Sequence, residues 1–419
     1  MNLAESLRVA MGSLAANKMR SSLTMLGIII GVGAVIAMMS IGRGAQAQVT
    51  DQIRSMGTNL LFITPGAIRE GAVRMQAGSA PTLTYEDALA IAAPGAVPEV
   101  VAVAPEAGFF GQIIAGSNNV NTRILGVTPE YEYVRNFRVA EGEFVTRQHI
   151  DSRALVAVLG ASTAASLFPN ESPVGQQVNV AAGNRRIRLR VIGVLEPKGS
   201  QAMGNQDDLL IVPLTTLQQR LMAQRTARGG RNVSTINVQL ASEERAVMDA
   251  AVQKIGDLLR ERHRVYEDDF TIRSQEEMLA TINQVMGVMT LLLGAIAGIS
   301  LVVGGIGIMN IMLVSVTERT REIGIRKAVG AKRRDILVQF LVESVTVSVV
   351  GGAVGILLGS GLSALVASID FGGQRMPSIV TPDAVLLAFG VSAAIGIFFG
   401  IYPASRAARL NPIDALRYE

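Results

Sequence analysis

Four long stretches without a charged side chain place the strongest constraint on how this chain can fold. Each has enough residues to cross about 30 Å of hydrocarbon as an α-helix, which rises about 1.5 Å per residue. Hydrophobic residues make up 49% of the 419 residues and charged residues 17%, a balance typical of a membrane protein with a water-exposed part. We therefore predict transmembrane helices at residues 21–44, 281–317, 336–369 and 384–405.

The second apolar stretch is longer than a bilayer is thick. From Met278 to Thr317 it has about 40 residues, which would measure about 60 Å as one helix. We expect the extra length to continue outside the membrane, so that residues 281–317 combine a transmembrane helix with a stalk.

Basic residues flank these stretches on one side of the membrane. They precede the first stretch, follow the fourth, and seven of them join the second stretch to the third. The positive-inside rule then places three segments in the cytoplasm: an amphipathic helix at 1–20, the charged segment 318–335, and a tail at 406–419. We predict a multi-pass membrane protein with both termini cytoplasmic. The net charge of +4 then indicates contact with membrane lipid and not with nucleic acid.

The first stretch has an alternative interpretation as a secretory signal peptide, because "RGAQAQ" contains an Ala-x-Ala pattern after an apolar run. The run is longer than the apolar part of a signal peptide, and cleavage would remove one of the four crossings. We therefore favour a retained transmembrane helix.

Residues 45–280, between the first two stretches, are the part that can form a water-soluble domain. Strand and helix patterns in the order β-α-β occur at both ends, at about 45–120 and 231–280, and predict an α/β platform. Short strand candidates separated by Gly and Pro fill about 121–230, which predicts an inserted, mainly β subdomain. "TARGGRN" is expected to be a flexible connection back to the platform.

The residues that commonly carry chemistry are scarce. Cysteine is absent, which excludes disulfides, thiolate metal sites and cysteine catalysis. The two histidines, His149 and His263, are far apart in the sequence and are expected to be surface residues without a metal ion. Ser162 lacks the G-x-S-x-G pattern of a serine nucleophile. We expect no catalytic, cofactor-binding or metal-binding residue in this chain, and thus no enzyme.

Glycine recurs at four-residue spacing in the apolar stretches. This spacing places small residues on one helix face, where they allow two backbones to approach closely in lipid. General helix packing explains the pattern, and a sliding contact within a dimer is the alternative. The glycines concerned are Gly27, Gly31, Gly294, Gly298, Gly351, Gly355, Gly359, Gly396 and Gly400.

Ionisable residues are missing from the centres of the predicted spans. Ion and proton transporters usually carry such residues there, because charged cargo needs polar contacts. The nearest exception is Glu343, which we expect close to the cytoplasmic interface in an ion pair with Lys18, Arg20 or Arg334. The sequence therefore offers no hydrophilic path through the membrane.

The densest cluster of charge, "ERTREIGIRKAVGAKRRD" from Glu318 to Asp335, lies between two apolar stretches. A positive-inside loop would explain its basic residues, but not its three acids, and a segment with both signs of charge suits a protein partner. Ile323, Ala328 and Val329 are expected to form a small apolar patch. Gly324 and Gly330 are expected to allow bends.

Three stretches resemble the permeases of ABC transporters of the MacB and FtsX-like group, also called type VII. "ERTREIGIRKAVGAKRRDIL" is similar to the coupling helix of that family, "YPASRAARLNPIDALRYE" to its C-terminal pattern, and "ANKMRSSLTMLGIIIGVGAVIAMMSIG" to its first span. The resemblance covers essentially the whole chain. It implies that residues 45–280 form a porter-like platform with an inserted, mainly β subdomain. It also implies a protein of the bacterial inner membrane that turns ATP-driven closure of its partners into movement outside the membrane, termed mechanotransmission.

The resemblance also implies partners. The segment from Glu318 to Ala331 would dock onto a cytoplasmic ATPase, present in two copies, that binds ATP and Mg²⁺. The chain has no G-x-x-x-x-G-K-[ST] loop, so we expect the ATPase to be a separate subunit. A second permease, identical or similar, and an extracytoplasmic adaptor complete the expected assembly. The expected coupling residues are Glu318, Arg319, Arg321, Glu322, Ile323, Gly324, Arg326, Lys327 and Gly330.

Two functions fit this architecture. The first is a permease subunit that drives export or extraction of a substrate. The alternative is an FtsX-like regulator that transmits ATPase-driven motion to a cell-envelope hydrolase, or a sensor. The sequence does not identify the cargo.

Overall fold

The structure is a computed structural model, and it describes most of the chain. The described residues are 18–55, 59–66, 69–70, 73–74, 81–182, 185–198, 200–201, 204–222, 230–369 and 378–417. Nearly all of the predicted N-terminal helix at 1–20, and most of "TARGGRN", lie outside these ranges. The chain divides into two compact units, a helical unit of residues 1–47 and 283–419 and an α/β unit of residues 48–282.

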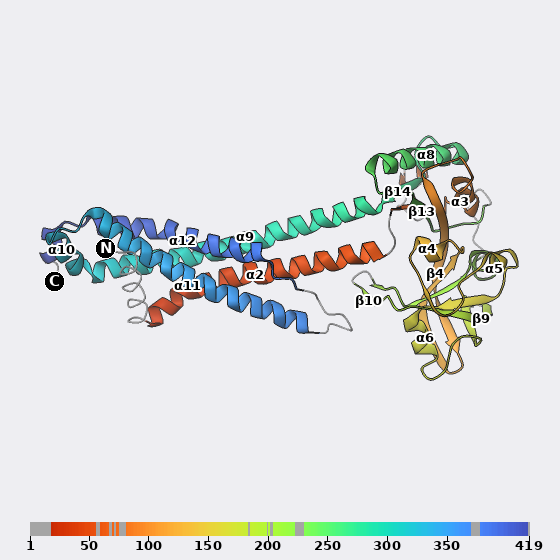
Figure 1. Ribbon diagram of the computed structural model, residues 1–419, viewed down its shortest axis with the longest axis horizontal. Helices are drawn as coiled ribbons and strands as arrows, with labels where there is room; N and C mark the ends of the chain where they lie inside the picture. The colour runs from red at the N-terminus through yellow and green to blue at the C-terminus, as the bar shows by residue number, and fades with distance from the viewer. Residues whose placement is uncertain are drawn as a thin grey trace. The chain divides into compact units, whose positions relative to one another are not determined.

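Four long helices dominate the helical unit, and two short helices lie at its charged segment and tail (Figure 1). All four long helices are long and apolar enough to cross a membrane. Most of their ends lie beyond the limits predicted from the apolar runs alone, since polar residues continue the helices; α11 instead ends one residue before its predicted limit of 369. The helices are α2 (Lys18–Ser55), α9 (Gln275–Glu318), α10 (Thr320–Ala328), α11 (Arg333–Ser368), α12 (Pro382–Arg409) and α13 (Pro412–Arg417).

Helix α9 is continuous over 44 residues. At about 1.5 Å per residue its length is about 66 Å, more than twice the thickness of the hydrocarbon core. It begins at Gln275, directly after strand β14 (Phe270–Ser274), so no loop separates the strand from the helix. The predicted boundary at residue 280 therefore lies inside the helix.

The described residues of the α/β unit form one ten-stranded sheet and two isolated two-stranded hairpins. The order of the main path is β14-β1-β13-β4-β5-β12-β7-β9-β6, and β8 pairs with β4 and β9. The strands of the sheet are β1 (Leu60–Pro65), β4 (Val100–Ala115), β5 (Asn118–Val127), β6 (Val139–Gly142), β7 (Val156–Leu159), β8 (Gln177–Ala182), β9 (Arg185–Leu195), β12 (Leu209–Pro213), β13 (Thr235–Leu240) and β14. The hairpins are β2 (Arg69–Glu70) with β3 (Val73–Arg74), and β10 (Ser200–Gln201) with β11 (Gly204–Asn205).

The helices of this unit are short except for one. Helix α8 has 19 residues and shows an apolar face of buried residues. The helices are α3 (Tyr85–Ile91), α4 (Tyr131–Val134), α5 (Arg147–Asp151), α6 (Ala161–Leu167), α7 (Leu214–Thr216), the π-helix η1 (Leu217–Leu221) and α8 (Arg245–His263).

Two interleaved β-α-β units form the platform. One is β1-α3-β4 and the other is β13-α8-β14, as the sequence patterns predict. Strand β1 lies between β13 and β14 and is antiparallel to both, with Leu61 opposite Val238 on one side and Ser274 on the other. Because β13 separates β1 from β4, each β-α-β unit is split by a strand of the other, which is the ferredoxin-like arrangement.

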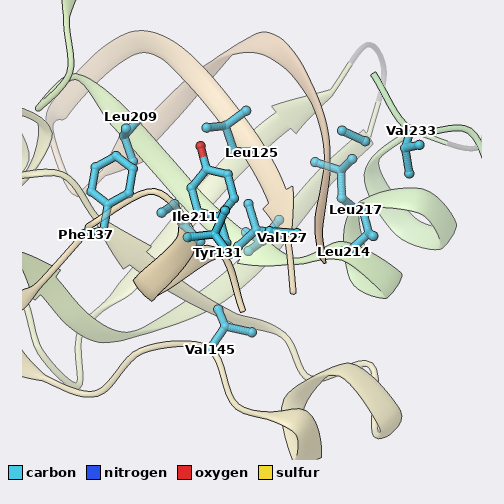
Figure 2. Close-up of a cluster of buried hydrophobic side chains, with 14 of the residues drawn as sticks. Leu125, Val127, Tyr131, Phe137, Val145, Leu209, Ile211, Leu214, Leu217 and Val233 are labelled. Atoms are coloured by element: carbon cyan, nitrogen blue, oxygen red, sulfur yellow. The ribbon is translucent and has the colours of Figure 1, made fainter. Parts of the chain in front are cut away.

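Strand β4 joins the platform to the inserted strands (Figure 1). Its first part, residues 100–106, pairs with β13, and residues 106–115 pair with β5. The predicted boundary at residue 121 falls inside β5, because the inserted strands extend the platform sheet and do not form a separate sheet. A hydrophobic core fills this junction (Figure 2). There the rings of Tyr131 and Phe137 stack with their centroids 5.7 Å apart.

These observations confirm the predicted fold class: four apolar transmembrane helices, with a large α/β domain between the first and the second.

Candidate functional site

The charged segment folds as a short helix and a tight turn. Helix α9 is interrupted at Arg319, and α10 follows at Thr320, whose hydroxyl donates to the backbone oxygens of Val316 and Thr317. The chain leaves α10 through Gly330, which has φ of +108°, a conformation that favours glycine. The predicted bend at Gly330 is present. The bend predicted at Gly324 is not, because that residue is buried within α10.

The acids of this segment have partners inside the chain. Glu322 accepts a hydrogen bond from Arg326, one turn along α10. Asp335 accepts from the backbone N–H of Lys332 at 3.0 Å and so caps the start of α11. These two acids therefore stabilise local structure, and their presence does not by itself indicate a protein partner.

Glu343 is paired with a residue that the sequence did not suggest. Nη1 of Arg319 lies 3.4 Å from both carboxylate oxygens of Glu343, which is buried on α11. The predicted ion pair between Glu343 and Arg334 is wrong. Arg319, at the break between α9 and α10, lies beside the carboxylate instead. Lys18 and Arg20 lie where side chains are not described.

Two further basic residues of the segment hold neighbouring helices. Nζ of Lys327 donates to the backbone oxygens of Ala408 at 2.6 Å and Leu410 at 2.7 Å, where α12 ends. These carbonyls have no partner within their own helix, so the lysine caps α12. Nη1 of Arg326 donates to Gln339 Oε1 of α11 at 2.8 Å. Arg319, Arg326 and Lys327 thus bind the segment to the bundle.

The outward side of α10 presents a different set of residues. Arg321, Ile325 and Val329 are exposed at a spacing of four residues, which places them on one helix face, and Val329 is 85% exposed. We call these three residues the outward stripe; Glu318 and Glu322 are also exposed. The predicted apolar patch is wrong in part, since Ile323 is 1% exposed and belongs to the bundle core.

Most of the predicted glycines lie where helices approach closely. A Cβ atom on Gly27 would lie 2.8 Å from the Cα of Gly304, and one on Gly31 would meet Leu301. On α11, Gly355 and Gly359 lie against the backbone of α2, and Gly351 has looser contact with Ile28 of that helix. On α12, Gly396 and Gly400 lie against Ser348 and Ser344. These contacts join α2 to α9 and α11, and α11 to α12.

Gly294 and Gly298 behave differently from the other glycines. A Cβ atom on either would have no neighbour within 4 Å among the described atoms. Both line an apolar cavity of about 300 Å³ between α2, α9 and α12. Neither glycine therefore packs against another helix among the residues that the structure describes.

A buried ionic cluster in the α/β unit corrects the expectation that His263 is a surface residue. His263 is 5% exposed. Its Nδ1 lies 2.6 Å from Asp269 Oδ1, and its Nε2 lies 3.0 Å from Asp87 Oδ2. Arg262 also donates to Asp87, and the Thr84 hydroxyl shares that carboxylate in the capping box of α3.

The acids change the protonation of this histidine. Burial alone would lower the pKa of His263, but the hydrogen bonds to Asp269 and Asp87 outweigh it and raise the pKa to about 9. Burial alone would likewise raise the pKa of Asp87, but His263, Thr84 and Arg262 hold it well below its usual range. At neutral pH His263 is therefore an imidazolium, hydrogen-bonded to Asp269 and Asp87. His149, by contrast, is partly exposed near Glu143.

Within the described ranges, no three His, Asp or Glu side chains converge on a point where they could hold a metal ion. In the His263 cluster the two carboxylates contact different nitrogens of the ring and leave no shared position for an ion. The described residues instead bring together a long helix, a charged segment that is held to the bundle by hydrogen bonds and an ion pair, and glycine contacts between helices.

Comparisons with known proteins cover nearly the whole chain. The MacB-like periplasmic core domain matches residues 21–258, and the FtsX-like permease C-terminal domain matches residues 294–412. The chain is 41% identical over 420 residues to the macrolide export ATP-binding/permease protein MacB of Bdellovibrio bacteriovorus, with 99% of this chain and 62% of that protein covered. The protein of the same description from Azoarcus sp. is 44% identical over 419 residues, with 100% of this chain and 60% of that protein covered.

The chain thus spans about three fifths of the length of these relatives. Among solved structures, the periplasmic region of MacB from Actinobacillus actinomycetemcomitans aligns with a TM-score of 0.44 and 24% identity, covering 56% of this chain and 96% of that one.

Proposed function

Because the chain belongs to the family of MacB-like and FtsX-like permeases, as a multi-pass inner-membrane protein with a periplasmic-type domain, we propose that it is the permease unit of an ABC transporter. It couples ATP hydrolysis to movement of its α/β domain and so drives export or extraction of a substrate. The ATPase lies outside these 419 residues, which contain no G-x-x-x-x-G-K-[ST] loop. ATP and Mg²⁺ bind there, and the chain itself is not an enzyme.

The observation that carries this proposal is the continuity of α9. One uninterrupted helix leads from Gln275, at the end of β14, to Glu318, and only Arg319 separates it from α10. A helix of this kind transmits a displacement along its axis, because its backbone hydrogen bonds resist compression and bending. The outward stripe on α10 is the surface to which the ATPase binds.

The remaining features of the proposed assembly are those expected of a member of this family. Two ATPase copies act on two permease units, identical or similar, and an extracytoplasmic adaptor receives the substrate. Both termini and the charged segment lie in the cytoplasm, in agreement with the positive-inside rule. The relatives are described as macrolide exporters, and an amphiphilic cargo of that kind would fit a mechanism without charged residues in the middle of the spans.

A proline in α9 tests the proposal. Val288 is half-exposed on this helix, so Val288→Pro removes one backbone hydrogen bond and kinks the helix without emptying the core. In proteoliposomes with the ATPase, we expect Val288→Pro to retain ATP hydrolysis and lose substrate movement, while Val288→Ala retains both. Normal transport by the proline variant would show that α9 does not carry the motion.

A further inference from the structure

Strand β9 carries a row of arginines on its solvent side. Arg186, Arg188 and Arg190 are exposed, while Leu189 and Val191 between and after them are buried. Successive residues of a strand point to opposite faces, so the three arginines project from one face, with their Cα atoms about 6.8 Å apart along the strand. We call the solvent side of β9, β8, β4 and β5 the arginine face.

The neighbouring strand β8 extends this face with uncharged side chains. Ala181, Asn179 and Gln177 of β8 lie opposite the three arginines in the sheet register. On β4 and β5 the same face continues with exposed amides, and Nε2 of Gln112 donates to Oδ1 of Asn119 at 3.1 Å.

An aromatic ring also lies on the arginine face. Phe110 of β4 is 77% exposed, although it is a large apolar side chain. Arg186 and Arg188, together with Arg220 of η1, line an open depression of about 450 Å³ beside the sheet.

The arginines have no counter-charge in the described part of the chain. No described carboxylate lies within 4.0 Å of Arg186, Arg188 or Arg190. The one acid on this side of the four strands, Glu106, is buried and paired with Arg123 at 3.3 Å. Like charges on adjacent positions of one face repel one another, so this row is unfavourable for the isolated domain.

We propose that the arginine face binds a carboxylate-rich surface of an extracytoplasmic protein. Guanidinium groups bind carboxylates in a bidentate manner and are less strongly hydrated than ammonium groups, which suits them to interfaces. The face has arginine, an aromatic ring and amides but neither lysine nor an exposed acid, which is the composition of protein interfaces and not of a surface that only needs to be soluble. This proposal does not depend on the coupling to an ATPase.

Binding of a defined acidic peptide tests the proposal. The purified full-length chain in detergent micelles is titrated with a fluorescent poly-L-glutamate peptide of about 20 residues, at an ionic strength low enough for a Debye length of about 10 Å. The variant Arg186→Gln/Arg188→Gln/Arg190→Gln is expected to bind about tenfold more weakly, since three partly exposed ion pairs are lost. Unchanged thermal unfolding shows that this variant is folded.

A matched variant distinguishes an effect of the arginine face on peptide binding from an effect of the net charge. Arg138, Arg264 and Arg273 are exposed on other parts of the same domain, and Arg138→Gln/Arg264→Gln/Arg273→Gln removes the same charge. We expect its affinity for the peptide to change by no more than about twofold. Equal losses in both variants, or no binding by the unmodified chain, would overturn the proposal. Stronger binding of alginate fragments than of the peptide would overturn it in favour of an anionic glycan.

Discussion

Arg319 and Glu343 join the break between α9 and α10 to helix α11, with Nη1 of the arginine 3.4 Å from each carboxylate oxygen. Glu343 is nearly buried, and the Arg319 side chain is about one third exposed. Removing one partner leaves the other charge poorly solvated, so we expect Glu343→Ala to lower the free energy of unfolding by about 1–3 kcal/mol. Thermal unfolding in detergent measures this effect.

The double variant Arg319→Ala/Glu343→Ala tests whether the lost stability comes from the interaction between the two side chains or from each substitution independently. If the two side chains stabilise each other, the loss in the double variant is smaller than the sum of the two single losses. Strictly additive losses would show that the contact contributes nothing to stability.

The outward stripe should be required for contact with the ATPase but not for folding. Ile325 and Val329 are exposed, so Ile325→Glu/Val329→Glu is expected to leave the melting temperature almost unchanged. It should abolish stimulation of ATP hydrolysis by substrate, because two charges would be buried at the docking surface. Lys327→Met is the contrasting variant, since it removes the cap of α12 and should lower thermal stability instead. ATPase activity of the Ile325/Val329 variant at the normal level would exclude the stripe as the docking surface.

Close glycine packing predicts different effects on stability for substitutions at two glycines of the same helix. Gly304 lies against Gly27 of α2, and a side chain there would collide with backbone. Gly304→Leu is expected to destabilise the bundle by about 1–3 kcal/mol or more. Gly298→Leu faces the apolar cavity and should be close to neutral. Melting temperatures in the same detergent compare the two, and equal destabilisation would contradict the packing seen here.

The order of elements could be predicted from the sequence because it depends on local signals. Apolar runs gave the four helices, and alternating apolar residues with turn residues gave the β-α-β patterns at both ends of the α/β domain. The interleaving of these two units could not be predicted, since strand β1 pairs with strands that are more than 170 residues away in the sequence. Pairing at that distance leaves no local pattern.

The side chains of the charged segment show a second limit. Helix α10 has nine residues, and charged residues surround both isoleucines, so periodicity did not reveal that Ile323 is buried and Ile325 exposed. The partners of Glu343 and His263 could not be predicted either, because these side chains meet residues that are distant in the sequence only in the folded protein. One local signal was available: Thr84 and Asp87 have the spacing of a capping box, which indicates a fixed carboxylate at the start of α3.

The orientation of the chain can be tested with single cysteines, since the sequence has none. Val329 in the charged segment and Tyr266 between α8 and β14 are highly exposed, so a cysteine at either position can react. In intact spheroplasts, a membrane-impermeant maleimide should label Tyr266→Cys and leave Val329→Cys unlabelled. After lysis both should be labelled. Labelling of both cysteines in intact spheroplasts would place α10 and the α/β domain on the same side of the membrane, and α9 could not then cross it.

The buried cluster of His263, Asp87 and Asp269 predicts how stability depends on pH. The pKa of His263 is raised to about 9, above its value of about 6.5 in the unfolded chain, so its contribution is complete below about pH 6.5 and is lost as the pH rises through about 9. The lowered pKa of Asp87 has the opposite effect: its contribution is present above about pH 4 and is lost as the pH falls.

Thermal unfolding of the full chain between pH 6 and pH 9.5, followed by circular dichroism, measures this dependence. We expect the free energy of unfolding of the α/β domain to fall by up to about 3 kcal/mol over that range, because each unit of pKa shift corresponds to about 1.4 kcal/mol. His263→Gln should be less stable at pH 6 and should lose most of the slope. His149→Gln is the matched control, since its side chain is partly exposed and its nearest acid, Glu143, lies 4.0 Å away. If His263→Gln kept the slope of the unmodified chain, the pH dependence would have to arise from another group.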